Sequence, residues 1–262
     1  MYDFDYKRAT TNTDAIDLYS ESEDPRFLAG GMTLIPVLKQ RLDQPTDLID
    51  LTDISELKGI SLEGANIVIK AMTTHHAVSV SKIILDKIPA LAHLASTIGD
   101  QMVRNRGTIG GSLANSDPAA SYPSAVLSLN ATVKTDKREI AADDFFTGMF
   151  DTALDDGELI VAVSFPIPEE AGYMHFPNPA SRYPIVGSFV SKSANIVRVA
   201  ITGAGPCAYR IPEFETALSS NFAPEAIKDI KVSDDGLNSD IHASAEYRAH
   251  LINVMTRRAI SK

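Results

Sequence analysis

The sequence predicts a mixed fold of helices and short strands, in two parts that meet near Pro168. Short apolar runs with strand character alternate with segments of helical spacing, and two pairs of these runs have the pattern of β-hairpins. The composition then shifts over 166–170, which reads Pro-Ile-Pro-Glu-Glu. A chain of 262 residues, 44% of them hydrophobic, has enough apolar material for one or two domains with a core.

The first half of the chain is expected to begin with strand–helix alternation and to continue with a hairpin. Apolar residues at helical spacing from Leu91 to Met102 predict a helix there, and Arg104 and Arg106 suit the dipole of its last turn. In chain order, the expected elements are a strand at 27–29, a helix at 34–42 capped by Thr33, a strand at 48–51, a hairpin of strands 60–62 and 67–69, and a helix from Pro89 that Gly107 ends.

The second half is expected to contain another hairpin and a long final helix. A loop at 108–111 precedes Asp117 and Pro118, which have the pattern of an N-cap and first helical residue. The expected elements are a helix from there to about Leu129, a hairpin of strands 131–133 and 139–141, a strand at 159–165, strands at 185–191 and 196–202, and a helix from Ser244 to Ile260.

Charge and cysteine content exclude several classes of function. Lys and Arg number 24 against 34 Asp and Glu, so the formal net charge is -10. Binding of a nucleic-acid phosphate backbone over a broad surface is therefore not expected. Cys207 is the one cysteine, which excludes an intrachain disulfide, a protein-only iron–sulfur site and a Cys-rich zinc site. No signal-peptide pattern or apolar run of about 18 residues is visible, so we expect a cytoplasmic location and no membrane span.

Two diglycine segments carry the strongest local signal. They are Ala29-Gly30-Gly31-Met32-Thr33 and Thr108-Ile109-Gly110-Gly111-Ser112. Glycine lets the backbone approach a ligand closely, and the first pair lies between a strand and a helix N-terminus, where an anion is favoured. Two such segments could hold the two phosphates of a dinucleotide from opposite sides. The alternative is that each pair is only a tight turn.

Other motifs fail in their context. The segment from Gly203 to Ala208 matches G-x-G-x-x-A, but Pro206 and Pro212 interrupt the helix that a Rossmann unit requires there. A nucleophile elbow around Ser112, with His175 as its base, lacks the preceding strand. His75 and His76 would point to different faces of an extended segment, and no other ligands are spaced for a metal. We therefore expect neither a catalytic dyad or triad nor a metal site in this chain.

Longer stretches around the diglycine segments resemble the FAD-binding medium subunit of molybdenum hydroxylases, the relatives of carbon monoxide dehydrogenase, aldehyde oxidoreductase and xanthine dehydrogenase. The matching stretches span nearly the whole chain in the order of that family. They are FLAGGMTLIPVLKQRL at 27–42, AMTTHHAV at 71–78, VRNRGTIGGSLANSDPAASYP at 103–123, PASRYPIVG at 179–187 and AEYRAHLINVMTRRA at 245–259.

This resemblance implies the fold class and the domain organisation. It implies an α+β fold in which a two-subdomain FAD-binding domain of the PCMH type precedes a small C-terminal domain with an antiparallel sheet and helices. The FAD-binding domain would cover 1–168, with subdomains of about 1–57 and 58–168. The C-terminal flavoprotein domain would cover 169–262.

The resemblance also assigns residues to FAD. The two diglycine segments would enclose the diphosphate, so that Gly110→Val would give flavin-free protein. Ser181, Arg182 and Tyr183 would approach the isoalloxazine ring. The residues implied to bind the cofactor are Ala29, Gly30, Gly31, Met32, Thr33, Leu34, Thr108, Ile109, Gly110, Gly111, Ser112, Asn115, Asp117, Ser121, Ile160 and Tyr183.

Some positions depart from the common family pattern. Many relatives have an acidic residue where this chain has Ser121, and often an asparagine in place of Ser112. Relatives often carry a lysine shortly before the Pro-Ala-Ser-Arg stretch, where this chain has His175 and Asn178.

The function that the resemblance implies is electron transfer within a larger complex. Substrate would be hydroxylated at a molybdenum–pterin centre in a large partner subunit. Electrons would pass through two [2Fe-2S] clusters of a small partner subunit to FAD on this chain, and then to an external acceptor. The complex would be a dimer of heterotrimers. Two alternatives stay open, namely a free-standing flavin oxidoreductase on the same fold and a non-redox dinucleotide-binding module.

Overall fold

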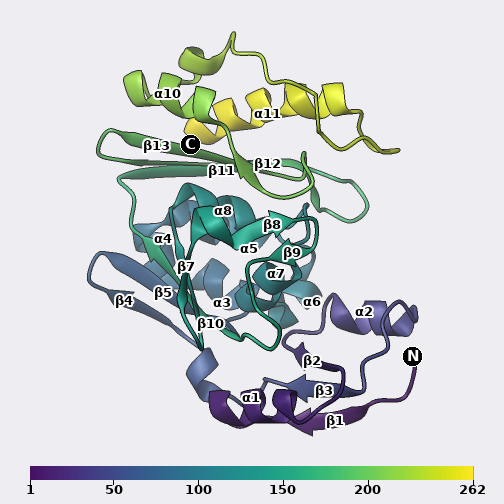
Figure 1. Ribbon diagram of the computed structural model, residues 1–262. Helices are drawn as coiled ribbons and strands as arrows, with labels where there is room; N and C mark the ends of the chain where they lie inside the picture. Colours follow the sequence, from purple (N-terminus) through teal and green to yellow (C-terminus); the bar gives the residue numbers. More distant parts are fainter. Residues whose placement is uncertain (262) are drawn as a thin grey trace.

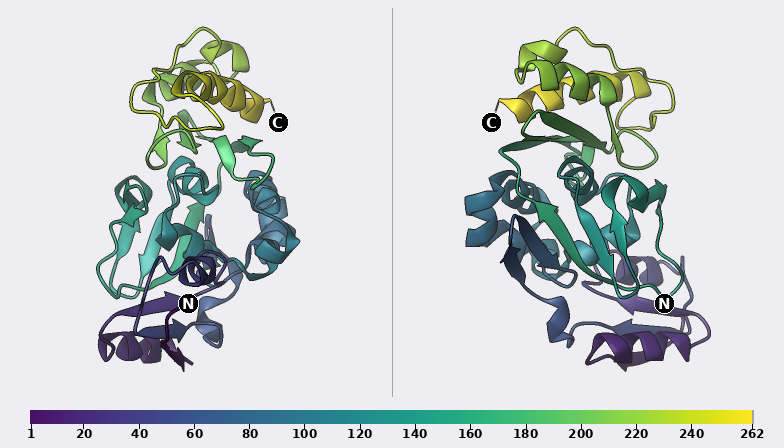
Figure 2. Two further views of the ribbon diagram at one scale, coloured as in Figure 1. Left: turned by 90° about the vertical axis from the view of Figure 1, so that its right-hand side faces the viewer. Right: turned by 60° about the vertical axis from the view of Figure 1, so that its left-hand side comes forward.

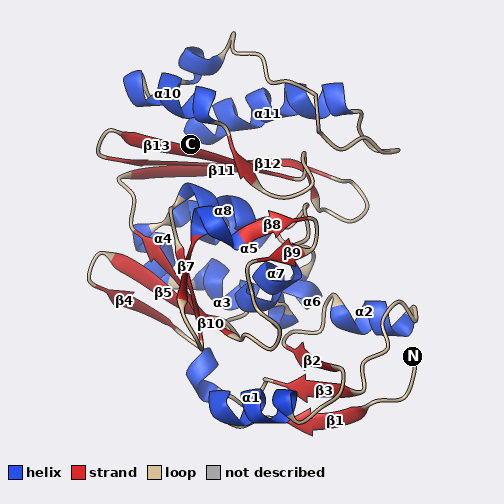
Figure 3. Ribbon diagram, viewed as in Figure 1, coloured by secondary structure: helices blue, strands red, loops and turns tan. Residues whose placement is uncertain are grey.

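Three layers, each built on its own β-sheet, follow one another along the chain in the computed structural model, which describes residues 1–261 (Figure 1). The N-terminal layer has a parallel sheet, the central layer an antiparallel sheet with most of the helices, and the C-terminal layer a second antiparallel sheet with helices on its outer face (Figure 3). The α+β class expected from the sequence is therefore confirmed.

The N-terminal layer is a three-stranded parallel sheet in the order β1-β3-β2. Helix α1 begins where the Thr11 side chain accepts a hydrogen bond from the backbone N–H of Asp14, and it buries Ala15 against the sheet. The elements of this layer are β1 (Asp5–Arg8), α1 (Asn12–Ser20), β2 (Pro25–Leu28), α2 (Leu34–Lys39) and β3 (Asp47–Asp50). Neither β1 nor α1 is predicted from the sequence.

The central sheet contains the two hairpins that the sequence predicts, joined by β10 between them. Its order is β4-β5-β10-β6-β7. Alternating apolar side chains such as Ile67, Ile69 and Val163 are fully buried in the largest core cluster. The strands and the preceding 3₁₀ turn are η1 (Ser55–Leu57), β4 (Ile60–Glu63), β5 (Asn66–Lys70), β6 (Thr132–Thr135), β7 (Glu139–Ala141) and β10 (Ile160–Pro166).

Helices and one small hairpin cover this sheet and extend toward both neighbouring layers (Figure 2). They are α3 (His75–Val80), α4 (Lys82–Lys87), α5 (Pro89–Thr97), α6 (Gln101–Arg106), α7 (Ile109–Asn115), α8 (Tyr122–Ser128), α9 (Ala142–Phe145), β8 (Phe146–Gly148) and β9 (Asp151–Thr152). Within residues 1–261, no helix combines the length and the apolar character needed to cross a bilayer.

The single helix predicted from Pro89 to Gly107 is wrong in one respect, because the chain forms two helices there. The chain breaks after Thr97, where Gly99 has a positive φ of 49°. Asp100 then caps α6 by accepting a hydrogen bond from the backbone N–H of Val103. Met102, expected on the buried face, is 77% exposed as a result.

Three further local predictions in this region are wrong. Residues 109–111 form the first turn of α7 rather than a loop, because the Thr108 side chain accepts from the N–H of Gly111. Asp117 does not open a helix; its carboxylate accepts from the N–H of Ala119 in a turn, and α8 begins at Tyr122. His75 and its neighbour begin helix α3 instead of lying in an extended segment.

The helix after the first diglycine is shorter than expected. It covers Leu34–Lys39, and Thr33 precedes it without making a side-chain cap hydrogen bond. Arg41 follows with a positive φ of 58°, which is incompatible with continuation of the helix to residue 42.

The C-terminal layer is a four-stranded antiparallel sheet in the order β11-β12-β13-β14. One face packs on α5 and α8 of the central layer, and the other packs on α10 and α11. The predicted final helix is confirmed, with the Ser244 side chain accepting from the N–H of Tyr247 at its start. The elements are β11 (Glu170–Pro177), β12 (Pro184–Ser193), β13 (Ile196–Thr202), β14 (Tyr209–Arg210), α10 (Pro212–Ser220), η2 (Pro224–Ile227) and α11 (Ala245–Ile260).

A close backbone contact between β11 and α11 gives a test of this layer. A Cβ built at Gly172 would lie 1.9 Å from the carbonyl oxygen of Ala259, so any side chain there must push the helix off the sheet. We expect Gly172→Ala to lower the free energy of unfolding by about 2 kcal/mol or more, measured by urea denaturation. The control is Gly148→Ala, whose nearest contact would be an ordinary 3.6 Å to the Asp151 side chain. Equal stability of the two variants would contradict this packing.

Candidate functional site

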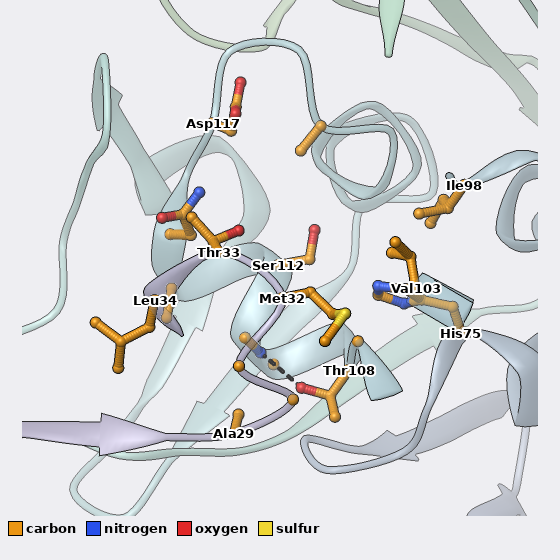
Figure 4. Close-up of a pocket in the computed structure, with 18 of the residues that line it drawn as sticks. Ala29, Met32, Thr33, Leu34, His75, Ile98, Val103, Thr108, Ser112 and Asp117 are labelled. Atoms are coloured by element: carbon orange, nitrogen blue, oxygen red, sulfur yellow. Dashed lines mark hydrogen bonds between the residues drawn. The ribbon is translucent and has the colours of Figure 1, made fainter. Parts of the chain in front are cut away.

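A cavity of about 720 Å³ lies where the three layers meet. Its walls come from the loop after β2, the start of α7, the loops after α5 and α7, the start of β10, and the loop that joins β11 to β12. Figure 4 shows Met32, His75, Thr108 and Ser112, which come from three separate segments, around one space. This volume falls within the range of pockets that bind small molecules and cofactors.

The first diglycine segment forms one wall and presents unpaired backbone donors. Within residues 1–261, the N–H groups of residues 30–34 have no hydrogen-bond acceptor. A Cβ at Gly30 would lie 2.2 Å from the carbonyl oxygen of Arg106, so only glycine permits this approach. Gly31 has a positive φ of 73°, which turns the chain into α2. Consecutive free N–H groups beside a cavity are suited to bind an anion.

The second diglycine segment lies next to the first, but the backbone donors of Ile109, Gly110 and Gly111 are already used. The N–H groups of Ile109, Gly110 and Gly111 donate to Thr73 O, Ala71 O and the Thr108 side chain, at 3.1, 2.8 and 3.1 Å. A Cβ at Gly111 would lie 3.4 Å from the Cβ of Ala29, so the two segments are in contact.

These contacts change what the Gly110→Val substitution would test. An added Cβ at Gly110 would lie 2.6 Å from the Cβ of Ala71, the residue directly after β5, and Gly110 is buried. A valine there would separate α7 from β5 rather than block a ligand. The loss of flavin predicted for this variant would therefore not identify a phosphate contact.

One end of the cavity is polar and is held by the C-terminal layer. Asp117 and Tyr183 both line this end. Burial raises the pKa of the Asp117 carboxyl, and burial together with the Asp117 charge raises the pKa of the Tyr183 phenol. The carbonyl of Pro118 accepts from the backbone N–H of Gly203 at 2.7 Å and from the Thr202 hydroxyl at 2.8 Å, which fixes the loop.

A buried carboxylate braces the loop that leads into β10. The Glu158 side chain is fully buried and accepts hydrogen bonds from the Arg138 guanidinium, the Thr135 hydroxyl at 2.6 Å and the N–H of Asp155 at 2.8 Å. The Arg138 guanidinium is the main cause that lowers the pKa of Glu158 to about 2. This network orients the following residues, Leu159 and Ile160, which line the cavity.

The structure brings nearly all sequence-predicted site residues together. Ile109 is the exception, because its side chain is buried in the main core cluster. The others lie on the cavity wall: Ala29, Gly30, Gly31, Met32, Thr33, Leu34, Thr108, Gly110, Gly111, Ser112, Asn115, Asp117, Ser121, Ile160 and Tyr183. Ser181 and Arg182 line it as well.

Sequence reasoning missed part of the opposite wall. The missed residues are Ile98, Gly99 and Asp100 between α5 and α6, Val103 on α6, and His75 at the start of α3. The sequence signal for this part of the wall was Gly99 followed by Asp100, since a Gly-Asp pair favours the end of one helix and the N-cap of the next.

The described residues hold no cluster suited to metal binding. Within residues 1–261, no three His, Cys, Asp or Glu side chains come close enough to hold a metal ion. His175, considered as a base for Ser112, lies on β11 and stacks on Tyr173 with 5.5 Å between ring centroids. What the cavity offers is backbone donors, a buried carboxyl and apolar walls, which together suit the binding of a polar cofactor.

Comparison with known proteins agrees with a cavity that binds a cofactor. Residues 2–168 match the model of the FAD binding domain in molybdopterin dehydrogenase. The nicotine 6-hydroxylase medium subunit of Paenarthrobacter nicotinovorans is 35% identical over 97% of this chain and 95% of its own. The carbon monoxide dehydrogenase medium chain of Afipia carboxidovorans is 34% identical over 99% and 96%. The structure of quinoline 2-oxidoreductase from Pseudomonas putida superposes with a TM-score of 0.89, at 29% identity over 99% and 96%.

The fold and the cavity thus define a flavoprotein of the FAD-binding class. The chain belongs to the FAD-binding medium subunits of the molybdenum hydroxylases, which are oxidoreductase subunits of the carbon monoxide, aldehyde and xanthine dehydrogenase type.

The Glu158 network predicts a defined acid sensitivity. The folded pKa of about 2 lies below the ordinary glutamate pKa of 4.5, so the stabilisation is present above about pH 4.5 and is lost as the pH falls toward 2. We expect Glu158→Gln to lower the free energy of unfolding at pH 7 by about 2 kcal/mol and to flatten its pH dependence between those values. Asp155→Asn, at a 67% exposed side chain, should change it by less than about 0.5 kcal/mol. An unchanged acid profile in Glu158→Gln would contradict the assignment.

Proposed function

We propose that the cavity binds FAD with the diphosphate against the N–H groups of residues 30–34. The single observation that carries this proposal is the run of unpaired backbone donors beside a cavity of about 720 Å³. These donors fit a diphosphate because they are fixed, neutral and close to one another. Ser112 and Asn115, on the neighbouring wall, add side-chain groups that can hydrogen-bond to the cofactor.

The two ends of FAD are proposed to occupy opposite ends of the cavity. The isoalloxazine would lie toward Tyr183, Asp117 and Ser121, where an aromatic side chain that is 46% exposed can pack against a flat ring. The adenine end would lie toward Ile160 and Leu159. Bound FAD would supply reversible electron storage, while this chain's groups bind it, exclude water and set its electrostatic surroundings.

We further propose that this chain passes electrons within a complex. A large partner subunit would carry molybdenum–pterin, and a small partner subunit would carry two [2Fe-2S] clusters that reduce the FAD bound here. The lone Cys207 supports this division, since one thiol cannot hold such clusters. The medium-chain names of the relatives support it as well. Assembly as a dimer of heterotrimers and a cytoplasmic location remain predictions.

The proposed domain division follows the sheets. The FAD-binding domain would cover 1–168, with subdomains of about 1–57 and 58–168, and the C-terminal flavoprotein domain would cover 169–262. In support, the three sheets are formed by strands within 5–50, 60–166 and 170–210, with β8 and β9 as a separate small hairpin.

Ligand fragments test the placement of the diphosphate. We expect the flavin-free chain to bind FAD at least about 100-fold more tightly than riboflavin, because riboflavin leaves the donors of residues 30–34 unused. Flavin fluorescence titration measures both affinities. ADP, which shares the diphosphate and adenine, should compete with FAD. Equal affinity for FAD and riboflavin would contradict the proposed site.

Co-purification tests the electron-transfer role against the two alternatives. When the chain is tagged in its native host, we expect two partner chains with molybdenum and iron to accompany it, and the bound flavin to be bleached by dithionite. A chain that carries flavin alone and oxidises a substrate would support the free-standing enzyme. A chain that binds a dinucleotide without flavin absorbance would support the non-redox module.

A further inference from the structure

An imidazole lies buried at the floor of the cavity without a protein partner. His75 is 5% exposed and lines the cavity, and its backbone N–H donates to the carbonyl of Gly107 at 2.9 Å. The side-chain Nδ1 is sealed from solvent and has no hydrogen-bond partner. No hydrogen bond joins Nε2 to any of residues 1–261 either. Nε2 is not among the sealed atoms and has no protein partner, so this edge of the ring is a candidate to contact a ligand in the cavity.

The surroundings of the ring keep it neutral and select one tautomer. Burial and the Arg104 charge lower the pKa of His75 to about 4, so the ring carries a single N–H at pH 7. Tyr122 packs against the ring with 5.4 Å between centroids. A sealed N–H without an acceptor is rarer than a sealed acceptor without a donor. The proton therefore belongs on Nε2 rather than on the sealed Nδ1.

Only one edge of the His75 ring can be reached by a ligand in the cavity. Because His75 lines the cavity and Nδ1 is sealed, the accessible edge carries Nε2. Figure 4 shows the ring directed into the cavity from α3, on the side of Met32 and Thr108. A donor N–H is thus presented to the cavity.

Gly107 places this donor beside the first diglycine segment. A Cβ at Gly107 would lie 2.6 Å from His75 Nε2, and a Cβ at Gly30 would lie 2.8 Å from the Cα of Gly107. Gly107 is therefore a thin spacer, with the imidazole on one side and the unpaired N–H groups of residues 30–34 beginning on the other. No side chain larger than hydrogen fits between them.

We propose that the Nε2–H of His75 donates a hydrogen bond to the diphosphate half of FAD, beside the N–H groups of residues 30–34. This inference rests on the proposed function, because it assigns a further donor to the same site. A neutral N–H bonded to an anionic phosphate makes a charge-assisted hydrogen bond, which is stronger than one between neutral groups. Arg104 contributes positive charge behind the ring.

Three variants separate this binding role from a structural one. His75→Leu should weaken FAD binding by about tenfold or more, because it removes the donor. The thermal midpoint of its flavin-free form should stay equal or rise, because an unpaired buried polar group is removed. His75→Gln, whose amide reaches about as far as Nε2, should keep FAD affinity within about threefold of wild type. His76→Leu is the matched control at the exposed neighbour, and it should leave FAD affinity unchanged. If the leucine variant does not fold, His75→Phe takes its place.

Fluorescence titration with FAD, ADP and riboflavin, together with thermal unfolding of each flavin-free variant, decides the outcome. His75→Leu should weaken FAD and ADP by similar factors and leave riboflavin unaffected. Wild-type affinity for FAD in His75→Leu would overturn the inference, and so would a loss confined to riboflavin. A lower thermal midpoint with unchanged affinity would show a packing role only. If wild-type chain binds no FAD, the proposed function itself fails, which is a separate and recognisable result.

Discussion

The cavity depends on close contact between backbone segments of different layers, and glycine makes that contact possible. Gly30 lies against the carbonyl of Arg106, and a Cβ there would come within 2.2 Å of it. Gly111 faces Ala29 across the same junction. Because the contact at Gly30 leaves no room for a side chain, the N-terminal layer rests directly on α6, and Ala29 touches α7 at Gly111 (Figure 1). The space enclosed by this junction is the cavity that we propose binds FAD.

A second constraint connects the C-terminal layer to the same cavity through hydrogen bonds. Arg248 on α11 is buried and donates to the carbonyls of Ile185 and Gly203 at 2.7 and 2.9 Å. The N–H of Gly203 in turn donates to the carbonyl of Pro118, next to Asp117. The polar end of the cavity is therefore held in place by a helix from the far end of the chain. This explains how a layer outside the matched FAD-binding region still shapes the site.

Helices and hairpins that form through local contacts could be predicted from the regular spacing of their apolar residues. The hairpin of β4 and β5 and the helix from Ser244 have patterns of apolar residues and caps that the structure confirms. The break at Gly99 was not predicted, because apolar spacing continues across it to Met102. Strand β1 also escaped prediction, since Asp5–Arg8 is polar and its pairing with β3 is with a distant part of the chain.

The sequence by itself determined the family, the α+β class and the set of segments around the cofactor cavity, because glycine pairs and their flanking motifs are local features. Only the tertiary structure decided which backbone donors are free. The N–H groups near Gly110 are used by Ala71 and Thr73, whereas those of residues 30–34 are not, and no local pattern distinguishes the two diglycine segments. The place of His75 beneath Gly107 was decided in the same way, since burial and the lack of a partner arise only when distant segments pack together.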